Sequence, residues 1–423
     1  GSLDPEGFRA YDPVCSKKPK DVASQNVSPQ VLRCDSVSMR CAQKKTGTFQ
    51  FREPKPWRNR LNRTHSFVAL LLVLTLEDSL SASERNTQNV ILITLDGART
   101  QEIFGGLDLE ILKSVVKRGK VEDRSAYRKY WAATPQERRE KLMPFFWGTW
   151  MKKHGHIYGN RSLSSTAAIT NQHRFSYPGY SEILTGQAHD DVINSNDSKR
   201  NPYPSVLEFL KKKLSLPPER VAAFSSWETM NWIAEHEEGA IPVNAGFEAY
   251  QDPDAAVREL SRLQFETLTP WGSVRHDIYT FRFAMAHLKK HKPRVLYLSL
   301  GETDDWAHDG EYELVLEALH QTDDRFRRLW EFLETHSSYR GKTSIVISTD
   351  HGRGNGPADW RDHGKDVEGA QYIWLGIVSP DSAKRGEQSN SGTVYQNQIA
   401  ATLCRFLGVD YSEHNPTAGK PVD

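Results

Sequence analysis

Acidic residues and histidines follow three apolar runs of the sequence, and these residue types in these places could bind metal ions. The runs are Val90–Leu95, Arg294–Leu300 and 343–349. Apolar, β-branched runs of this length predict buried parallel strands, whose carboxyl ends meet at one edge of a sheet. Carboxylate and imidazole groups gathered at such an edge favour Zn²⁺ or a similar divalent ion. The candidate ligands are Asp96, Asp304, His308, Asp350, His351 and, in a later polar stretch, His363.

A serine in the segment Phe175–Tyr180 is the candidate nucleophile. Taken alone, Ser176 would be an ordinary loop residue, but its place among the ligand segments predicts a catalytic role. A serine hydroxyl is a weak nucleophile near neutral pH, and a metal ion favours its alkoxide. Two ions about 3.5–4 Å apart could also clamp the attacking and leaving oxygens of an in-line displacement.

The order of these segments resembles the alkaline phosphatase superfamily, and within it the type I phosphodiesterase/nucleotide pyrophosphatase branch. The resemblance covers about Asn89 to Gly408. Together the motifs are specific to the superfamily, but they do not specify a substrate. In chain order they are Leu95-Asp96-Gly97, Ser176-Tyr177-Pro178, Thr185-Gly186, Asp304 with His308, Thr349-Asp350-His351-Gly352, and His363.

This resemblance implies a site for two divalent ions. Asp304, His308 and His363 would hold one ion. Asp96, Asp350 and His351 would hold the other, with the Ser176 hydroxyl beside them. The resemblance favours Zn²⁺, and Mn²⁺ or another divalent ion is left open. Asp305 and Asp309 are alternatives to Asp304, which is preferred because it keeps the four-residue spacing to His308.

One position departs from the branch. Gly179 stands where the branch usually has an asparagine that helps to hold a phosphoryl oxygen. Another donor is therefore expected, and a cationic one would favour a phosphate monoester over a diester. The candidates carried forward as substrate-binding residues are Arg174, Asn194 and Lys199, with Asn171, His173 and Asn196 as further possibilities.

The pattern of the whole chain predicts a doubly wound α/β fold, in which helices sandwich a mostly parallel sheet. Strands are expected at Val90–Leu95, Val221–Ser226, Val295–Leu300, Thr343–Ser348 and Tyr372–Val378. Helices are expected at Ser205–Leu214, His276–Lys290, Glu311–His336 and Val394–Leu407. An aromatic and charged insertion at about 105–165 is expected either to cap the site or to pack as helices on the sheet edge.

The N-terminal part differs in character. Residues 1–65 are polar and non-periodic, and they are expected to be disordered or absent from the mature protein. Residues 66–83 contain the apolar run Phe67–Leu76, which is too short to span a bilayer but suits a signal peptide. We therefore expect a periplasmic or secreted enzyme whose catalytic domain is 84–423. A disordered tail with a buried strand is the alternative. Removal of the leader would leave Cys404 and remove Cys15, Cys34 and Cys41.

The sequence therefore predicts a metal-dependent hydrolase of small phosphate esters that works through a phospho-Ser176 intermediate. A phosphodiesterase, a nucleotide pyrophosphatase and a sulfatase-like hydrolase are alternatives, as is a metal-stabilised binding protein without catalysis. The net charge of +1, with basic residues spread and balanced, carries no nucleic-acid-binding signature. No stable membrane span is predicted, and the oligomeric state is left open.

Overall fold

The computed structural model describes residues 85–422. The predictions for residues 1–65 and 66–83 lie outside this part, and so do three of the cysteines. Cys404 is buried and forms no disulfide with any described residue. No helix between residues 85 and 422 combines the length and the hydropathy needed to cross a membrane.

An eight-stranded sheet forms the centre of the described part. The neighbours β7, β1, β6, β4 and β5 run parallel, while β9 pairs antiparallel with both β7 and β2. The strand order is β10 (Gly386–Glu387), β2 (Gly155–Tyr158), β9 (Leu375–Val378), β7 (Thr343–Ser348), β1 (Asn89–Leu95), β6 (Val295–Leu300), β4 (Val221–Ser225) and β5 (Val243–Ala245). A second sheet has the order β11 (Gly392–Tyr395), β3 (Ser165–Ala168) and β8 (Tyr372–Ile373). The predicted fold class, an α/β fold with a mostly parallel sheet, is confirmed.

Helices connect the strands and cover both faces of the large sheet. The α-helices are α1 (Thr100–Gly105), α2 (Leu109–Val115), α3 (Ser125–Tyr130), α4 (Pro135–Leu142), α5 (Ser176–Thr185), α6 (Val206–Lys213), α7 (Met230–Ile233), α8 (Ala255–Glu266), α9 (Asp277–His291), α10 (Glu302–His308), α11 (Tyr312–Thr335) and α12 (Ile399–Phe406). Shorter or wider helices are η1 (Val121–Asp123), the π-helix η2 (Phe146–His154), η3 (Arg161–Leu163), η4 (Pro218–Arg220), η5 (Gln396–Gln398) and η6 (Tyr411–Glu413).

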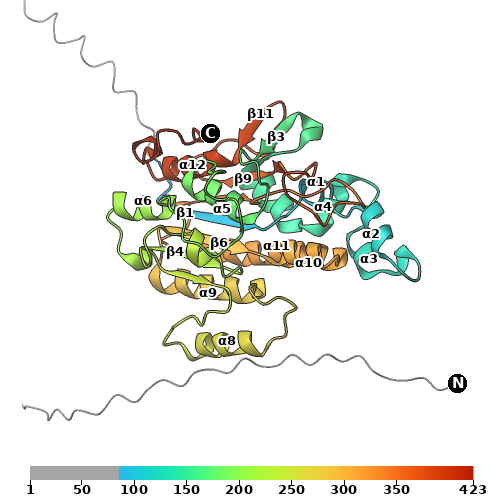
Figure 1. Cartoon of the computed structure of the whole chain (residues 1–423), viewed down its shortest axis with the longest axis horizontal. Helices are drawn as coiled ribbons and strands as arrows, with labels where there is room; N and C mark the ends of the chain where they lie inside the picture. The colour runs from blue at the N-terminus through green and yellow to red at the C-terminus, as the bar shows by residue number, and fades with distance from the viewer. Residues whose placement is uncertain (1–84, 423) are drawn as a thin grey trace, which may run out of the picture. The chain divides into compact units, whose positions relative to one another are not determined.

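The two faces of β1 point into two separate apolar clusters, because successive side chains of a strand alternate between faces. Ile91, Ile93 and Leu95 belong to the cluster that contains residues of α9 and α11. Val90 and Leu92 belong to the cluster that contains residues of α5, α6 and α12. Figure 1 shows the same layering, with α5, α6 and α12 on one side of β1 and α9 and α11 on the other.

The aromatic residues of the insertion contribute to the first of these clusters. Trp150 of η2 stacks on Phe326 of α11 with ring centroids 4.7 Å apart. Phe146 makes an edge contact with Trp374, and both side chains are fully buried. The side chain of Asp323 on α11 accepts hydrogen bonds from the backbone N–H groups of Phe145 and Phe146 at 2.9 and 2.7 Å. Helix η2 is thus fixed against α11, and β2 follows it into the sheet.

The structure differs from the sequence-based elements in two places near the chain's end. The expected strand Tyr372–Val378 is divided at Trp374, whose indole N–H donates to the Ala98 carbonyl at 3.0 Å. The residues on either side of Trp374 pair in different sheets, β8 with β3 and β9 with β2 and β7. The expected helix Val394–Leu407 begins instead with β11, because the chain pairs with β3 before α12 starts at Ile399.

Candidate active site

The three central strands β7, β1 and β6 deliver the candidate ligands to one edge of the sheet. Their register is parallel, with Val90 opposite Val295 and Ile91 opposite Ile345, so their carboxyl ends align. Asp96 follows β1 directly, and its backbone N–H donates to the Leu300 carbonyl at the end of β6 at 2.9 Å. Asp350 and His351 follow β7, and α10 follows β6.

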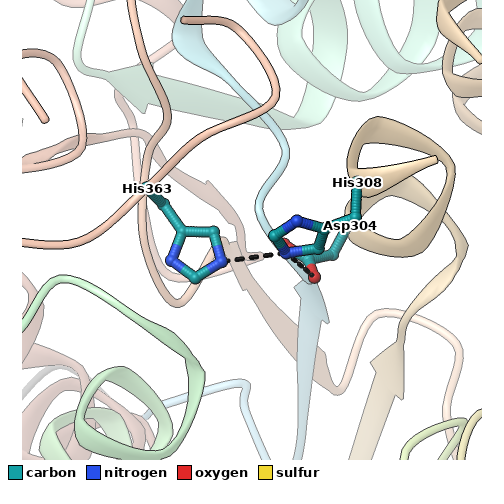
Figure 2. A group of neighbouring side chains, drawn as sticks. All are labelled: Asp304, His308 and His363. Atoms are coloured by element: carbon teal, nitrogen blue, oxygen red, sulfur yellow. Dashed lines mark hydrogen bonds and ion pairs between the residues drawn. The ribbon is translucent and has the colours of Figure 1, made fainter. Parts of the chain in front are cut away.

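Asp304, His308 and His363 form the first candidate metal group (Figure 2). The Nε2 atoms of His308 and His363 lie 3.0 Å apart, and His308 Nε2 lies 3.2 Å from Asp304 Oδ2. Burial and the neighbouring His351 lower the pKa of His363 to about 2, so its imidazole is neutral. A neutral imidazole is the form that binds a metal. The Nδ1 atom of His363 is buried and has no hydrogen-bond partner among the described residues.

The second group surrounds His351, which is fully buried. Its Nε2 lies 3.4 Å from Asp96 Oδ1, 3.5 Å from Asp350 Oδ2 and 3.6 Å from Asp304 Oδ1. Asp304 therefore faces both groups, whereas the sequence-based division assigned it to one ion only. Burial, and then the charges of neighbouring carboxylates, raise the pKa values of Asp96 and Asp350 well above their usual range.

These residues fit divalent cations. Asp96 Oδ1 and Asp350 Oδ2 are buried, and neither has a hydrogen-bond partner between residues 85 and 422. Buried carboxylate oxygens are normally paired with a donor or a metal. Two unsatisfied carboxylate oxygens beside the Nε2 atom of His351 are thus an arrangement that a bound cation would stabilise.

Hydrogen bonds from neighbouring groups orient the second set of candidate ligands. The hydroxyl of Tyr180 donates to Asp96 Oδ2 at 2.8 Å. The backbone N–H of Gly97 donates to Asp350 Oδ1 at 3.0 Å. The ring Nδ1 of His351 donates to the Gly352 carbonyl at 2.9 Å, which turns Nε2 toward the carboxylates. The other atom of each side chain, Asp96 Oδ1, Asp350 Oδ2 and His351 Nε2, faces the centre of the group.

Ser176 lies at the first position of α5, beside this group. Its side chain is buried, and its Oγ lies 3.4 Å from His351 Nε2. Phe175 is the N-cap and provides no side-chain cap, but the Tyr177 N–H donates to Asn196 Oδ1 at 2.9 Å. The N–H of Ser176 itself has no hydrogen-bond partner within the described residues. A helix N-terminus attracts negative charge. The hydroxyl therefore lies where both the candidate cation site and the helix would stabilise an anion.

The three candidate substrate-binding residues lie in different surroundings. Arg174 has a positive φ of 56°, and its carbonyl accepts from the N–H of Gly364, the neighbour of His363, at 3.0 Å. The Lys199 side chain is 78% exposed and pairs with Asp197. Asn194 is exposed. Neither of the last two side chains forms a hydrogen bond or ion pair with Ser176 or a candidate ligand in the described part.

Gly179 lies directly against the backbone of Asp350. A Cβ atom at this residue would lie 2.3 Å from the Asp350 carbonyl oxygen and 2.9 Å from its carbon. The glycine is the point at which α5 touches the backbone after β7, one turn beyond Ser176. An asparagine side chain would not fit there, so the residue's role is close packing rather than the loss of a phosphoryl donor.

A buried arginine that the sequence analysis missed lies within the site. Arg353 is 1% exposed, and its guanidinium donates to the Asp304 carboxylate and to the Arg361 carbonyl. Burial alone would raise the pKa of Asp304, but Arg353 and the two histidines hold it well below its usual range. The sequence offers no signal for this residue, because an arginine after His351-Gly352 resembles any loop arginine. Of the alternatives to Asp304, Asp309 accepts from the Trp271 indole at 3.0 Å and faces away.

Comparison with known proteins gives a likeness in structure only. No protein-family model matches the sequence, and no curated protein matches it. The chain is similar to the solved structure of the lipoteichoic acid synthase LtaP from Listeria monocytogenes, with 12% identity over 77% of this chain and 73% of that chain, and a TM-score of 0.50. At this identity the likeness shows a shared fold alone.

Two further solved structures have TM-scores below 0.5, and we draw nothing from them. One is the phosphonate monoester hydrolase SpPMH from Silicibacter pomeroyi, with 12% identity over 76% of this chain and 73% of that chain, at a TM-score of 0.46. The other is a protein in the alkaline phosphatase superfamily from Vibrio parahaemolyticus, with 12% identity over 77% and 67% and a TM-score of 0.45.

Proposed function

We propose that this protein is a metal-dependent hydrolase of small phosphate esters and that Ser176 is its covalent nucleophile. The observation that carries the proposal is the position of the Ser176 hydroxyl, buried at the N-terminus of α5 and 3.4 Å from His351 Nε2. A lone serine at a helix end would mean little. This one adjoins two buried carboxylates, each with one oxygen that has no hydrogen-bond partner in the described part.

Two divalent ions, Zn²⁺ in the first instance, would bind at the two groups. Asp304, His308 and His363 would hold one ion, and Asp96, Asp350 and His351 the other. Bound there, the ions would supply Lewis acidity and favour the serine alkoxide. Because Asp304 faces both groups, it is the residue through which the two ions would be coupled.

The residues divide the work of the reaction. Ser176 Oγ forms the bond to phosphorus as the ester bond breaks, and the proton lost by the hydroxyl is balanced by the one that the leaving alcohol takes up. Water then cleaves the phospho-Ser176 bond, which releases inorganic phosphate and regenerates the hydroxyl. The Ser176 N–H and the positive end of α5 would stabilise the charge that develops on the phosphoryl oxygens.

Arg174 is the residue that would bind a phosphoryl oxygen in this scheme. Its backbone joins the Ser176 segment to the His363 segment through the Gly364 N–H. Among the described residues, its half-buried guanidinium has only a long contact, 3.5 Å to the Val367 carbonyl. A cation there would favour a monoester dianion, so we propose a phosphomonoesterase. Asn194 and Lys199 are weaker candidates, because their side chains are exposed.

Two other functions remain as alternatives. A phosphodiesterase or nucleotide pyrophosphatase would use the same nucleophile and ions, and it differs only in its preference for diesters. A sulfatase is less well supported, because Ser176-Tyr177-Pro178-Gly179-Tyr180 lacks the arginine of the sulfatase motif. A binding protein without catalysis would have no use for a hydroxyl placed at the helix end.

A direct test compares Ser176→Ala with Ser181→Ala, a buried serine of the same helix that contacts Asn201. Turnover of an aryl phosphate, its methyl aryl diester and an aryl sulfate would be measured on protein purified without chelator. Ser176→Ala should lower kcat by several orders of magnitude while the bound metal is retained. The control should keep most of the activity.

The same preparations would identify the intermediate. Acid quenching during turnover should leave a phosphoryl group on the peptide that contains Ser176, and metal analysis should give about two ions per chain. Hydrolysis by Ser176→Ala at the wild-type rate, or full activity in metal-free protein, would refute the proposal. A strong preference for the diester would instead support the phosphodiesterase alternative.

A further inference from the structure

A groove with a strongly positive lining lies at the opposite edge of the sheet from the candidate active site. Its volume is about 710 Å³. We call it the basic groove, and its lining residues are Gln88, Asn89, Arg220, Lys292, Arg294, Ser337, Ser338 and Lys342. The lining includes four cations and no acidic residue.

The sheet itself aligns three of these cations. Arg220, Arg294 and Lys342 are the residues that directly precede β4, β6 and β7. The Arg294 N–H donates to the Arg220 carbonyl at 2.8 Å, and the Asn89 N–H donates to the Lys342 carbonyl at 3.0 Å. Neighbouring strands lie about 4.8 Å apart. The register places Arg220 level with Arg294, and Lys342 one residue out of line with them across β1. The three cations therefore form a staggered row at the amino ends of the strands.

The charges of this row are not compensated within the described part of the protein. None of the four cations forms an ion pair with a carboxylate of residues 85–422; the side chain of Arg294 donates to the Gln88 carbonyl, and that of Lys342 to the Ser337 carbonyl at 3.5 Å. The Nε of Arg220 is buried and has no hydrogen-bond partner there. Burial, and then the charge of Arg220, lower the pKa of Arg294.

The negative ends of nearby helices compensate only part of the positive charge in the basic groove. Helix α9 ends at His291, and Lys292 follows it, so the negative helix end stabilises that lysine. Arg220 ends η4, a single three-residue turn, and its buried nitrogen still lacks an acceptor. Two neighbouring guanidinium groups without an intervening acid repel each other, and folding has to overcome that cost.

We propose that the basic groove is a binding site for an anion that carries several phosphate groups, such as a short polyphosphate chain. Phosphate oxygens match the planar donor fork of arginine, and lysine adds charge at the rim. A row of cations suits a linear series of phosphates better than a single one. The site is separate from the catalytic centre, because strands of six residues hold the two edges about 20 Å apart.

The experiment compares a groove variant with a charge-matched control. Arg220→Gln/Lys292→Gln removes two cations whose side chains have no hydrogen-bond or ion-pair partner in the described part. Lys117→Gln/Arg118→Gln removes two exposed cations from the loop after α2. The affinity of each full-length protein for tripolyphosphate would be measured by titration calorimetry, and its metal content would be checked afterwards, because the probe also binds metals.

The wild type should bind the probe saturably, the groove variant at least tenfold more weakly, and the control within twofold of the wild type. Arg220→Lys, which keeps the charge, should retain most of the binding. Without probe, the groove variant should be at least as stable as the wild type, since a repulsion is removed. If it does not fold, Lys342→Gln takes its place. No saturable binding, equal binding by the groove variant, or equal losses in the control would overturn the proposal.

Discussion

Replacing Gly179 with alanine should damage the active site although the residue lies inside a helix. In an ordinary helix interior this change adds about 1 kcal/mol of stability. Here the new Cβ would lie 2.3 Å from the Asp350 carbonyl oxygen, whereas ordinary contact begins at 3.4 Å. Helix α5 must therefore withdraw from the end of β7 by about 1.1 Å, the difference between these two distances. That movement carries Ser176 away from His351.

The expected cost follows from this displacement. Overpacking of this kind destabilises by about 1–3 kcal/mol, and misplacing a reacting group by about 1 Å can lower the rate about 100-fold. We expect Gly179→Ala to lose most of its kcat and to unfold at a lower denaturant concentration, with its helix content unchanged by circular dichroism. The nucleophile is kept in this variant, so the loss reports position alone.

Gly105→Ala is the matched control. Gly105 lies in α1, has no positive φ, and an added Cβ there meets no atom within 4 Å. This variant should be as stable as the wild type or slightly more stable, and fully active. If Gly179→Ala were also stabilised and fully active, α5 would not pack against Asp350 as described, and the argument that Ser176 is positioned by this contact would be refuted.

Other perturbations test the surroundings of the site and the stability of the fold. Tyr180→Phe removes the hydrogen bond to Asp96 and should weaken metal affinity about 10–100-fold in a chelator competition, whereas Tyr297→Phe, whose hydroxyl contacts Thr94, should not. Chelation should lower the melting temperature, because it leaves buried carboxylates uncompensated; an unchanged melting temperature would count against a metal site. Burial lowers the pKa of His287 to about 4, whereas its value in the unfolded chain is near 6.5. The buried neutral imidazole therefore contributes stability that is fully present above pH 6.5 and is lost as the pH falls toward 4. The free energy of unfolding should fall by about 3 kcal/mol over this window. His287→Gln should flatten the pH dependence of unfolding in this window. Finally, N-terminal sequencing of exported protein should find a start near residue 84, and an intact N-terminus would refute the signal-peptide prediction.

Sequence patterns predicted the parallel core of the sheet well. The runs that became β1, β6 and β7 are apolar on both faces because helices cover both faces, and such strands produce continuous apolar stretches. Two shorter strands were missed for a different reason. β2 and β3 are four residues long, and their sequences, GHIY and STAA, have no pattern that distinguishes a short strand from a loop.

The residues that follow the central strands could be identified because backbone topology alone brings strand ends together. The residues that hydrogen-bond to these candidate ligands and their neighbours could not be identified in this way. Arg353 reaches Asp304 across the loop after β7, and Gln396 donates to the carbonyls of Thr349 and Asp350 from a segment nearly fifty residues away. Such contacts depend on how loops and short helices pack, and no spacing in the sequence encodes them. The position of Gly179 is a contact of the same kind.

The same parallel register explains why chemistry is expected at one edge of the sheet and binding at the other. At the carboxyl ends of β1, β6 and β7 the chain turns directly into acidic residues and histidines, and the N-terminus of α5 lies over them. At the opposite ends, the residues that precede β4, β6 and β7 are cations. Neither set is fully satisfied within the described residues, since Asp96 Oδ1 and Asp350 Oδ2 have no partner at one edge and Arg220 Nε has no acceptor at the other. The groups without partners are acidic at the carboxyl ends of the strands and basic at the amino ends. The two ends should therefore bind ligands of opposite charge: metal cations at the carboxyl ends and a phosphate-bearing anion at the amino ends.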